Sequence, residues 1–405
     1  MISPMDLLES LAVKSEKKIL LVVLDGLGGL PRKGKTELES ASIPHLNKLA
    51  AKAGLGLLTP VDVGITPGSG PAHLALFGYD PIKYDVGRGV LEALGIGLHP
   101  APSDLCARAN FATLAPDGTL KDRRAGRIPT ELCAELCDRL QTKIPMIEDT
   151  KVIVRPGIGH RFVVMFQGAG LAGGLTDSDP QQDGLKPLPV SSPDSAAAKS
   201  AQLANRFIVL AAATLKDQDK ANYVLLRGIA QPPSIPSMRD RFKLTPACVA
   251  AYPMYRGLAK LVGMDVIETG STWESEVKTL REHWGGSCDF FFVHFKETDK
   301  TGEDGDFDAK WELIEQFDEE ILPQLQALNP DVLCITGDHS TPALKGAHSW
   351  HEVPMLLASQ YACPADSREE FGERSCARGT LGRLNSVKLV NLLLAHSLKL
   401  KKFGA

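Results

Sequence analysis

Three short apolar segments, each followed by an aspartate, constrain the fold of this chain more than any other feature. They are Lys18–Leu24 before Asp25, Asp289–Phe295 before Asp299, and Asp331–Thr336 before Asp338 and His339. Continuous apolar runs of this length predict buried strands of a parallel sheet. The carboxyl edge of such a sheet is where α/β proteins place their ligands. Because the segments come from both ends of the chain, we expect those ends to form one domain.

Helix-like stretches separate these strands. One covers Ile43–Ala53, with Pro44 at its first turn, and another covers Ala309–Leu328, where apolar residues recur at helical spacing. Strands that alternate with helices predict a doubly wound α/β sheet.

The middle of the chain has a different composition. Its strand-like segments are Arg108–Leu114, His160–Phe166 and Asn222–Leu226, its loop-rich stretch is Gly168–Pro193, and its expected helix is Ser195–Leu215. Pro-rich stretches at 99–103 and 231–237 bracket this region. We therefore expect a smaller α/β domain, residues 96–235, inserted into a larger domain formed by residues 1–95 and 236–405.

Composition excludes several classes of protein. The chain has 405 residues, with 45 Lys and Arg against 49 Asp and Glu, so its net charge of −4 gives no basic field for nucleic acid. Eight cysteines without a CxxC pair favour a reduced, cytoplasmic compartment. We find no signal sequence and no apolar run long enough to span a membrane, and the oligomeric state stays open.

The acids that follow the strands have the chemistry of metal ligands. Carboxylates combined with imidazoles suit a divalent ion such as Mn²⁺ or Zn²⁺, and their number here suits two ions. The candidates are Asp25, Asp299, Glu303, Asp338, His339 and His348. A lone aspartate after a strand is more often a helix cap or a turn residue, but three such acids together with two histidines favour a metal site.

A serine lies between glycines and prolines in the segment Thr66–His73. Small neighbours would let a substrate approach the hydroxyl of Ser69, and a helix that begins there would direct backbone N–H groups at a phosphate. Taken alone, this pattern is more often a tight turn.

Arginines next to glycines form the third group of candidates. They lie in Asp122–Arg127, at Arg161 beside His160, at Arg227 and at Arg88. Such residues can bind phosphate or carboxylate with two hydrogen bonds. The alternative is an ordinary solvated charged face.

In order and spacing, these motifs resemble the archaeal-type 2,3-bisphosphoglycerate-independent phosphoglycerate mutases of the alkaline phosphatase superfamily. The resemblance rests on VVLDGLGGLP at 22–31, TPGSGPAHLALFGYDP at 66–81, KDRRAGRI at 121–128 and TGDHS at 336–340. It implies an alkaline-phosphatase-like fold with an inserted domain. It also implies that the chain interconverts 3-phosphoglycerate and 2-phosphoglycerate in glycolysis and gluconeogenesis, with two divalent metals and a transient phosphoserine.

The resemblance also implies roles for single residues. Ser69 would be the nucleophile and would share one metal with Asp25, Asp338 and His339. Asp299, His348 and the residue at 303 would hold the other. The family usually has a histidine at that position, whereas this chain has Glu303. We expect Glu303 to serve as a ligand, with His351 in reserve, and we favour Mn²⁺ over Mg²⁺, Zn²⁺ or Co²⁺.

The substrate-binding residues that the resemblance implies belong mostly to the inserted domain. They are His160, Arg161, Asp179, Arg227 and Arg256. The alternatives are a metal-dependent phosphatase, phosphodiesterase or other phosphomutase of the same superfamily, and a non-catalytic binding protein. The arginine-bearing insert favours a mutase over a hydrolase, and the retention of Ser69 with six metal-ligand candidates favours an enzyme.

Overall fold

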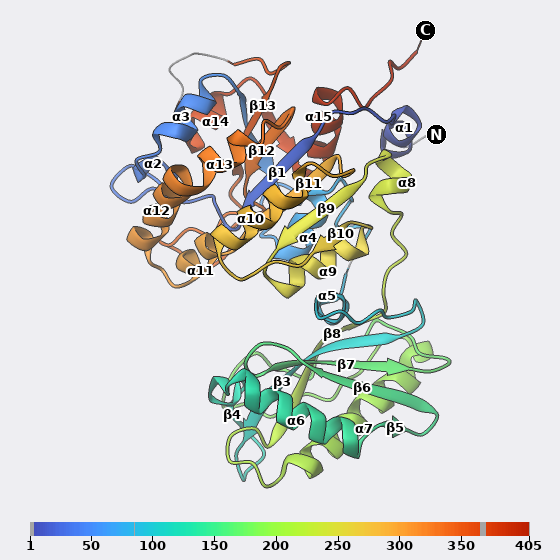
Figure 1. Cartoon of the computed structure of the whole chain (residues 1–405). Coiled ribbons are helices and arrows are strands. Elements are labelled where there is room, and N and C mark those ends of the chain that lie inside the picture. The colour runs from blue at the N-terminus through green and yellow to red at the C-terminus, as the bar shows by residue number, and fades with distance from the viewer. Residues whose placement is uncertain (1–3, 85, 365–369, 405) are drawn as a thin grey trace. The chain divides into compact units, whose positions relative to one another are not determined.

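The computed structural model describes residues 4–84, 86–364 and 370–404. They divide into two compact units, drawn in Figure 1. Unit 1 comprises Met1–Asp85 and Ile235–Ala405, and unit 2 comprises Val86–Ser234.

Unit 1 contains an eight-stranded sheet in the order β10-β9-β11-β1-β12-β13-β2-β14. Its strands are β1 (Ile19–Leu24), β2 (Gly54–Thr59), β9 (Pro246–Ala250), β10 (Asp265–Ile267), β11 (Phe290–Phe295), β12 (Val332–Thr336), β13 (Val353–Ser359) and β14 (Gly382–Asn385). The strands from β10 to β12 in that order are parallel, and β13 is antiparallel to both of its neighbours. The three apolar segments predicted as strands are therefore the adjacent central strands β11, β1 and β12.

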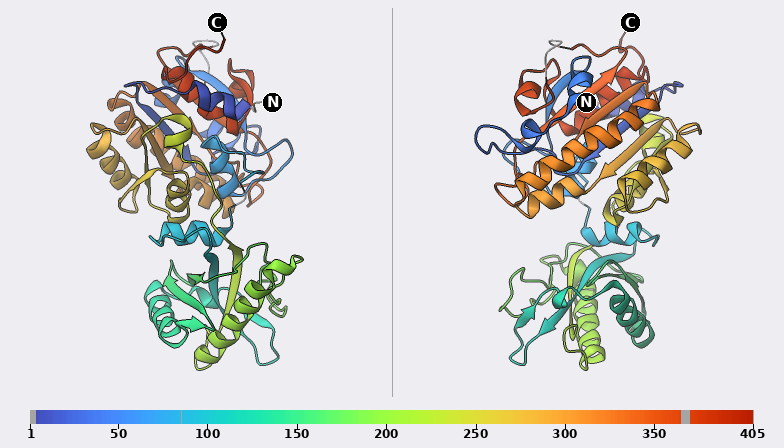
Figure 2. Two further views of the ribbon diagram at one scale, coloured as in Figure 1. Left: turned by 90° about the vertical axis from the view of Figure 1, so that its right-hand side faces the viewer. Right: turned by 60° about the vertical axis from the view of Figure 1, so that its left-hand side comes forward.

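Helices cover both faces of this sheet (Figures 1 and 2). They are α1 (Pro4–Leu11), α2 (Glu37–Ser40), α3 (Pro44–Ala50), α4 (Ser69–Leu76), α8 (Met238–Phe242), α9 (Pro253–Leu261), α10 (Trp273–Trp284), α11 (Glu297–Glu303), α12 (Phe307–Gln316), α13 (Leu322–Ala327), α14 (Glu373–Arg378) and α15 (Leu389–His396). Alternate residues of β11 show the division: Phe291 packs in the core with α10 and α12, while Phe292 contacts Phe77 beside α4. The central strands are buried on both sides, as their unbroken apolar pattern predicts.

Unit 2 contains a six-stranded sheet. Its strands are β3 (Leu105–Leu114), β4 (Leu120–Asp122), β5 (Met146–Ile147), β6 (Thr150–Pro156), β7 (Arg161–Gln167) and β8 (Tyr223–Ala230), and its helices are α5 (Arg88–Gly95), α6 (Thr130–Lys143) and α7 (Ala198–Leu215). Helices α6 and α7 pack on one face of the sheet, and α5 packs on the other. The α/β class predicted from the sequence is confirmed in both units.

The structure differs from the sequence expectation in several places, including the following three. The helix expected over 309–328 is a run of α12, a π-helical turn at Phe317–Ile321 and α13. Helix α6 and strand β6 were not anticipated. The units divide at 85/86 and 234/235 rather than at 95/96 and 235/236, because Val90 and Ala93 of α5 pack against β3 and β7 of unit 2.

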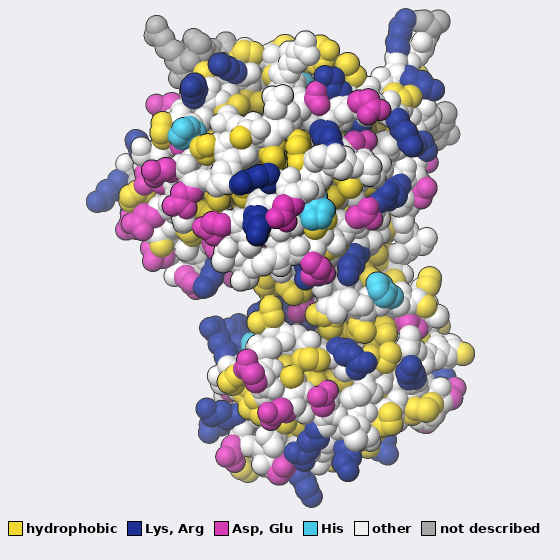
Figure 3. Space-filling model, in the orientation of Figure 1, with side chains coloured by type: hydrophobic (Ala, Val, Ile, Leu, Met, Phe, Trp, Pro, Cys, Tyr) yellow, Lys and Arg dark blue, Asp and Glu magenta, His cyan; other side chains and the backbone are white. Residues whose placement is uncertain are grey.

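Among the described residues, no helix is long and apolar enough to cross a membrane. Acidic and basic side chains are interspersed over the face shown in Figure 3, in keeping with the small net charge.

A buried lysine connects the loops that follow β1 and β12. Lys310 of α12 is fully buried, and its Nζ donates hydrogen bonds to the backbone oxygens of Gly26 (2.8 Å), Gly28 (3.2 Å) and Thr341 (2.8 Å). Gly26 has a φ of 67°, and a Cβ there would lie 2.6 Å from Thr341 Oγ1, so only glycine allows the two loops to approach this closely. Lys310 therefore fixes the backbone next to Asp25 and His339.

We expect Lys310→Met to destabilise the protein by about 2 kcal/mol, because the Thr341 carbonyl oxygen loses its donor and those of Gly26 and Gly28 keep only the Thr341 N–H that they share. Urea unfolding measures the change, with Lys278→Met on the exposed face of α10 as the matched control. An equal effect of the two substitutions would show that the hydrogen bonds of Lys310 do not stabilise the protein.

Candidate active site

The carboxyl edge of the central strands brings the sequence-predicted acids together. Asp25 follows β1, Asp338 and His339 follow β12, and Asp299 lies on α11 directly after β11. At most 1% of each of these side chains is exposed. They form two groups with the spacing of metal ligands: Asp25, Asp338 and His339, and Asp299, His339 and His348.

The first group surrounds one ring nitrogen of His339. His339 Nε2 lies 3.4 Å from Asp25 Oδ1 and 3.1 Å from Asp338 Oδ2. The hydroxyl of Ser69 is 3.2 Å from the same nitrogen. Ser69 is half-buried and is the first residue of α4, so the helix start expected at this serine is confirmed.

The second group lies on the other side of the same histidine. His348 Nε2 is 3.5 Å from Asp299 Oδ1, and the rings of His339 and His348 stack with centroids 3.7 Å apart. Glu303 Oε1 lies 3.7 Å from His348 Nε2, but 56% of the Glu303 side chain is exposed and it falls outside both groups. His351 instead contacts the Ser349 hydroxyl and is in neither group.

Hydrogen bonds fix the tautomers of the two histidines. His348 Nδ1 lies 3.0 Å from the Pro67 carbonyl oxygen, which can only accept, so this nitrogen carries the proton. The Thr341 hydroxyl donates to Asp299 Oδ1 (2.6 Å) and therefore accepts from His339 Nδ1 (3.0 Å). Both Nε2 atoms thus direct a lone pair toward the acids, the arrangement in which imidazoles bind metals.

This donor set fits divalent cations. The buried atoms Asp25 Oδ1 and Asp338 Oδ2 have no hydrogen-bond donor among the described residues. Buried carboxylate oxygens are normally hydrogen-bonded. These two oxygens instead face imidazole lone pairs, so a cation bound between them would provide the missing favourable interaction. Carboxylate oxygens and imidazole nitrogens together suit Mn²⁺, Mg²⁺ or Zn²⁺.

Several residues of the site were not identified from the sequence. Lys296 Nζ lies 2.9 Å from Asp25 Oδ2, 2.5 Å from Asp299 Oδ2 and 3.3 Å from the Tyr255 hydroxyl, which itself donates to Asp25. His73 Nδ1 lies 2.8 Å from the Ser69 carbonyl oxygen and 3.2 Å from Asp338 Oδ2. The available signals were weak: Lys296 precedes Asp299 by three residues, and His73 follows Ser69 by four.

These contacts set the protonation of the site. Burial alone would raise the pKa of Asp25, but the Lys296 ammonium and His294 hold it well below its usual range. The pKa of Asp338 is also lowered, since His339 and His73 outweigh the effects of burial and of Asp25. Burial lowers the pKa of His339, which keeps its Nε2 lone pair available at neutral pH. Asp25 and Asp338 are therefore ionised and able to bind cations.

Unit 2 carries a separate cluster of arginines. Register pairs Arg108 of β3 with Arg227 of β8, and Asn110 of β3 with Arg161 of β7, so these side chains share the sheet face opposite α6 and α7. Arg108 was not identified from the sequence, since its role depends on strand pairing. A face with several arginines suits an anionic ligand.

Acids next to this face orient two of the arginines. Arg123 binds Asp179 through two hydrogen bonds of 2.7 and 2.8 Å, while Arg227 lies 3.6 Å from both Asp177 and Asp179. Arg123 outweighs burial and keeps the pKa of Asp179 low. Arg256 is not part of this cluster, because it lies on α9 of unit 1, paired with Glu268. Its expected contact with substrate stays a prediction.

Burial and the nearby positive charges, Arg161 foremost, lower the pKa of His160 to about 4. His160 is 7% exposed, immediately before β7. It is therefore neutral at physiological pH despite standing among cations.

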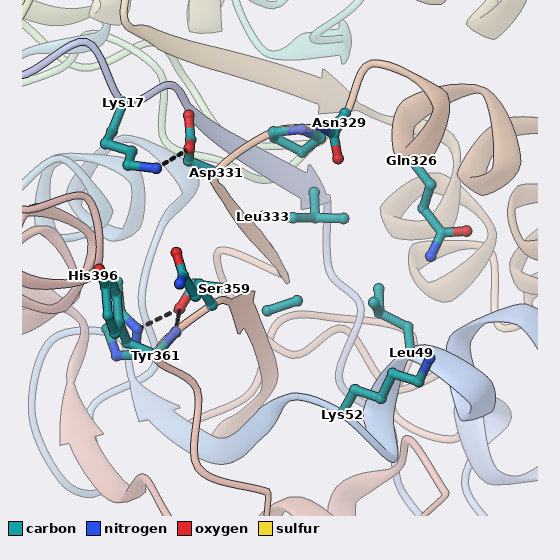
Figure 4. Close-up of a pocket in the computed structure, with 13 residues that line it drawn as sticks. Lys17, Leu49, Lys52, Gln326, Asn329, Asp331, Leu333, Ser359, Tyr361 and His396 are labelled. Atoms are coloured by element: carbon teal, nitrogen blue, oxygen red, sulfur yellow. Dashed lines mark hydrogen bonds and ion pairs between the residues drawn. The ribbon is translucent and has the colours of Figure 1, made fainter.

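A cavity of about 400 Å³ lies at the opposite edge of the unit 1 sheet (Figure 4). It is bordered by the residues before β1 and β12, and its polar groups largely satisfy one another: Lys17 pairs with Asp331 (2.7 Å) and Ser359 with His396 (2.7 Å). It contains none of the candidate ligands, which lie at the carboxyl edge.

Comparisons with known proteins agree with these motifs. The family described as 2,3-bisphosphoglycerate-independent phosphoglycerate mutase matches residues 50–220. A probable mutase of that description from Aquifex aeolicus is 50% identical over 99% of this chain and 100% of its own length. One from Thermus thermophilus is 51% identical over 98% of each chain.

Two solved structures are also similar. A protein from Pyrococcus horikoshii has a TM-score of 0.81 at 30% identity, over 96% of this chain and 99% of its own. A cofactor-independent phosphoglycerate mutase from Thermoplasma acidophilum has a TM-score of 0.68 at 30% identity, over 94% of this chain and 100% of its own.

The position of His160 gives a pH prediction. Its pKa is depressed by folding, so its contribution to stability is complete above the ordinary histidine pKa of about 6.5 and is lost as the pH falls toward about 4. We expect the ring to show no NMR titration between about pH 5 and 7, and we expect inorganic phosphate to raise its midpoint by offsetting the arginine charges. His160→Gln assigns the signal. A midpoint near 6.5 that phosphate leaves unchanged would contradict this account of the cluster.

Proposed function

The chain belongs to the 2,3-bisphosphoglycerate-independent phosphoglycerate mutases, isomerases that interconvert 3-phosphoglycerate and 2-phosphoglycerate, and on that premise we propose that Ser69 of unit 1 carries the phosphoryl group while unit 2 binds the rest of the substrate. The observation that carries the proposal is the contact of the Ser69 hydroxyl with His339 Nε2, the nitrogen that Asp25 and Asp338 of the first metal-ligand group also approach.

Ser69 is suited to the role of nucleophile by its place and its neighbours. Its oxygen attacks phosphorus, an Oγ–P bond forms, and the P–O bond to one glycerate oxygen breaks. The serine hydroxyl loses its proton in this step, and the released glycerate oxygen takes one up. The other glycerate hydroxyl then loses a proton and attacks phosphorus, a new P–O bond forms, the Oγ–P bond breaks and Ser69 Oγ regains a proton, so the phosphoryl group changes position with no net hydrolysis. Gly68 and Gly70 leave room for this approach, and the positive end of α4 favours the phosphate.

The acids and imidazoles described above would hold two divalent ions. Asp25, Asp338, His339 and Ser69 would hold one, and Asp299 and His348 would hold the other, with Glu303 close enough to join them. Bound there, divalent ions favour the serine alkoxide and neutralise charge on the transferring phosphoryl oxygens. We propose Mn²⁺ as the native ion, in keeping with the oxygen-rich donor set.

The arginine cluster of unit 2 would bind the carboxylate and phosphate of the substrate. His160, Arg161 and Arg227 supply the donors, and Asp179 orients Arg123 and Arg227 through the contacts that support this proposal. A mutase must retain the glycerate while the phosphoserine exists, and several charge-assisted hydrogen bonds meet that need. The same arginines distinguish the proposal from a hydrolase, which has no reason to hold the glycerate.

We expect Ser69→Ala to lower kcat by a factor on the order of 10⁴ or more, because the chain loses its nucleophile. A coupled assay with 3-phosphoglycerate measures the rate, and Thr66→Ala, which removes a nearby exposed hydroxyl, serves as the control. Rapid quenching and mass spectrometry of the wild-type protein are expected to place phosphate on Ser69. Full activity of Ser69→Ala, or release of inorganic phosphate in place of 2-phosphoglycerate, would overturn the proposed function.

Substitutions of Glu303 test the second metal site. We expect Glu303→Gln to lower the affinity for one of the two Mn²⁺ ions by about tenfold or more. We expect Glu303→His to bind both ions, with the metal preference shifted toward Zn²⁺. Elemental analysis after dialysis counts the ions, and Glu312→Gln, on α12, is the matched control. Two ions bound as tightly in Glu303→Gln as in the wild type would remove Glu303 from the ligand set.

A further inference from the structure

The two aspartates that Lys296 joins divide their oxygens in the same way. Asp25 Oδ1 faces His339 Nε2, and Asp299 Oδ1 faces His348 Nε2. The Oδ2 atoms of both aspartates instead contact Lys296 Nζ, at 2.9 and 2.5 Å. Lys296 therefore binds one acid of each candidate metal group through its Oδ2 atom. We call these two Oδ2 atoms, which do not face His339 or His348, the outer oxygens.

Other groups support this arrangement of Lys296. The Tyr255 hydroxyl donates to Asp25 Oδ2, and Lys296 Nζ lies 3.3 Å from that hydroxyl. His294 Nε2 lies 3.2 Å from Asp25 Oδ2. The lysine itself comes from the turn between β11 and α11, directly before the helix that carries Asp299. Its reach to both acids thus depends on the parallel pairing of β11 with β1.

We propose that Lys296 is a positioning residue that holds the outer oxygens of Asp25 and Asp299, leaves one oxygen of each for a metal ion, and so couples the two metal sites. The proposal rests on the two-metal site described above. Two consequences follow. Lys296 supplies the positive charge that keeps the acids together before metal binds, and it prevents either carboxylate from binding a metal through both oxygens.

The first consequence is tested by urea unfolding of Lys296→Met, Asp299→Asn and the double variant, each treated with a chelator to remove bound metal. We expect the unfolding midpoint to fall in Lys296→Met, because two buried carboxylates lose their cation, and to recover in the double variant, where one of those charges is gone. Lys300→Met, an exposed lysine of α11, is expected to leave the midpoint unchanged. A midpoint for Lys296→Met equal to that of Lys300→Met, or strictly additive effects in the double variant, would overturn the proposal.

The second consequence is tested by the visible spectrum of the protein loaded with Co²⁺. In Lys296→Met the Oδ2 atom of Asp299 loses the ammonium, whereas Tyr255 still donates to Asp25 Oδ2. The Asp299 carboxylate can then bind through both oxygens, which raises the coordination number and weakens the absorption. Lys296→Arg keeps the charge and is expected to restore the wild-type spectrum. Identical spectra for the wild type and Lys296→Met would overturn the proposal. If the methionine variants do not fold, Lys296→Arg decides: a wild-type spectrum supports the proposal and an altered one refutes it.

The two arms separate this inference from the proposed function. Elemental analysis of the wild type counts the bound Co²⁺. A wild-type protein that binds none contradicts the metal site itself, whereas the unfolding cycle on chelated protein still tests the lysine.

Discussion

Three carboxylates confined to one buried cluster are the constraint on which the rest of the site depends. Asp25, Asp299 and Asp338 lie at the edge of adjacent parallel strands, where topology places them within reach of the same imidazole. Like charges taken out of water repel one another and lose hydration, so the cluster requires compensating positive charge. Lys296 supplies part of this positive charge. The Asp25 and Asp338 oxygens without a hydrogen-bond donor, together with the Nε2 lone pairs, form a place where cations could supply the rest.

The surrounding scaffold serves this cluster. Lys310 holds the backbone of the loops after β1 and β12, and Gly26 permits their close approach. Thr341 and the Pro67 carbonyl oxygen accept the Nδ1 protons of the two histidines and so direct each Nε2 toward the acids. Unit 2 presents the opposite chemistry, a sheet face rich in arginine. Phosphoryl transfer relies on positioning and charge stabilisation, and the buried acids and imidazoles of unit 1 have the chemistry to bind cations for it.

The sequence predicted much of this and missed what depends on tertiary contacts. The central strands and their terminal acids were recognisable because a buried parallel strand is apolar along its whole length, a local property. Lys296 and Arg108 were missed because their roles arise from strand pairing, and no local pattern marks a lysine between two acids. The first domain boundary was expected at 95/96, whereas the units divide at 85/86, because α5 packs against strands that follow it in the chain. The sequence showed that position 303 carries a possible ligand, a glutamate, but it could not show how far Glu303 lies from His348.

The central claim is that one cluster at the carboxyl edge binds two divalent ions on either side of His339. Anomalous X-ray diffraction from crystals soaked in Mn²⁺ tests it most directly, since the method locates the ions without reference to activity. The account predicts two peaks, one beside Asp25, Asp338 and Ser69 and the other beside Asp299 and His348. A single peak, or peaks away from these residues, would contradict it.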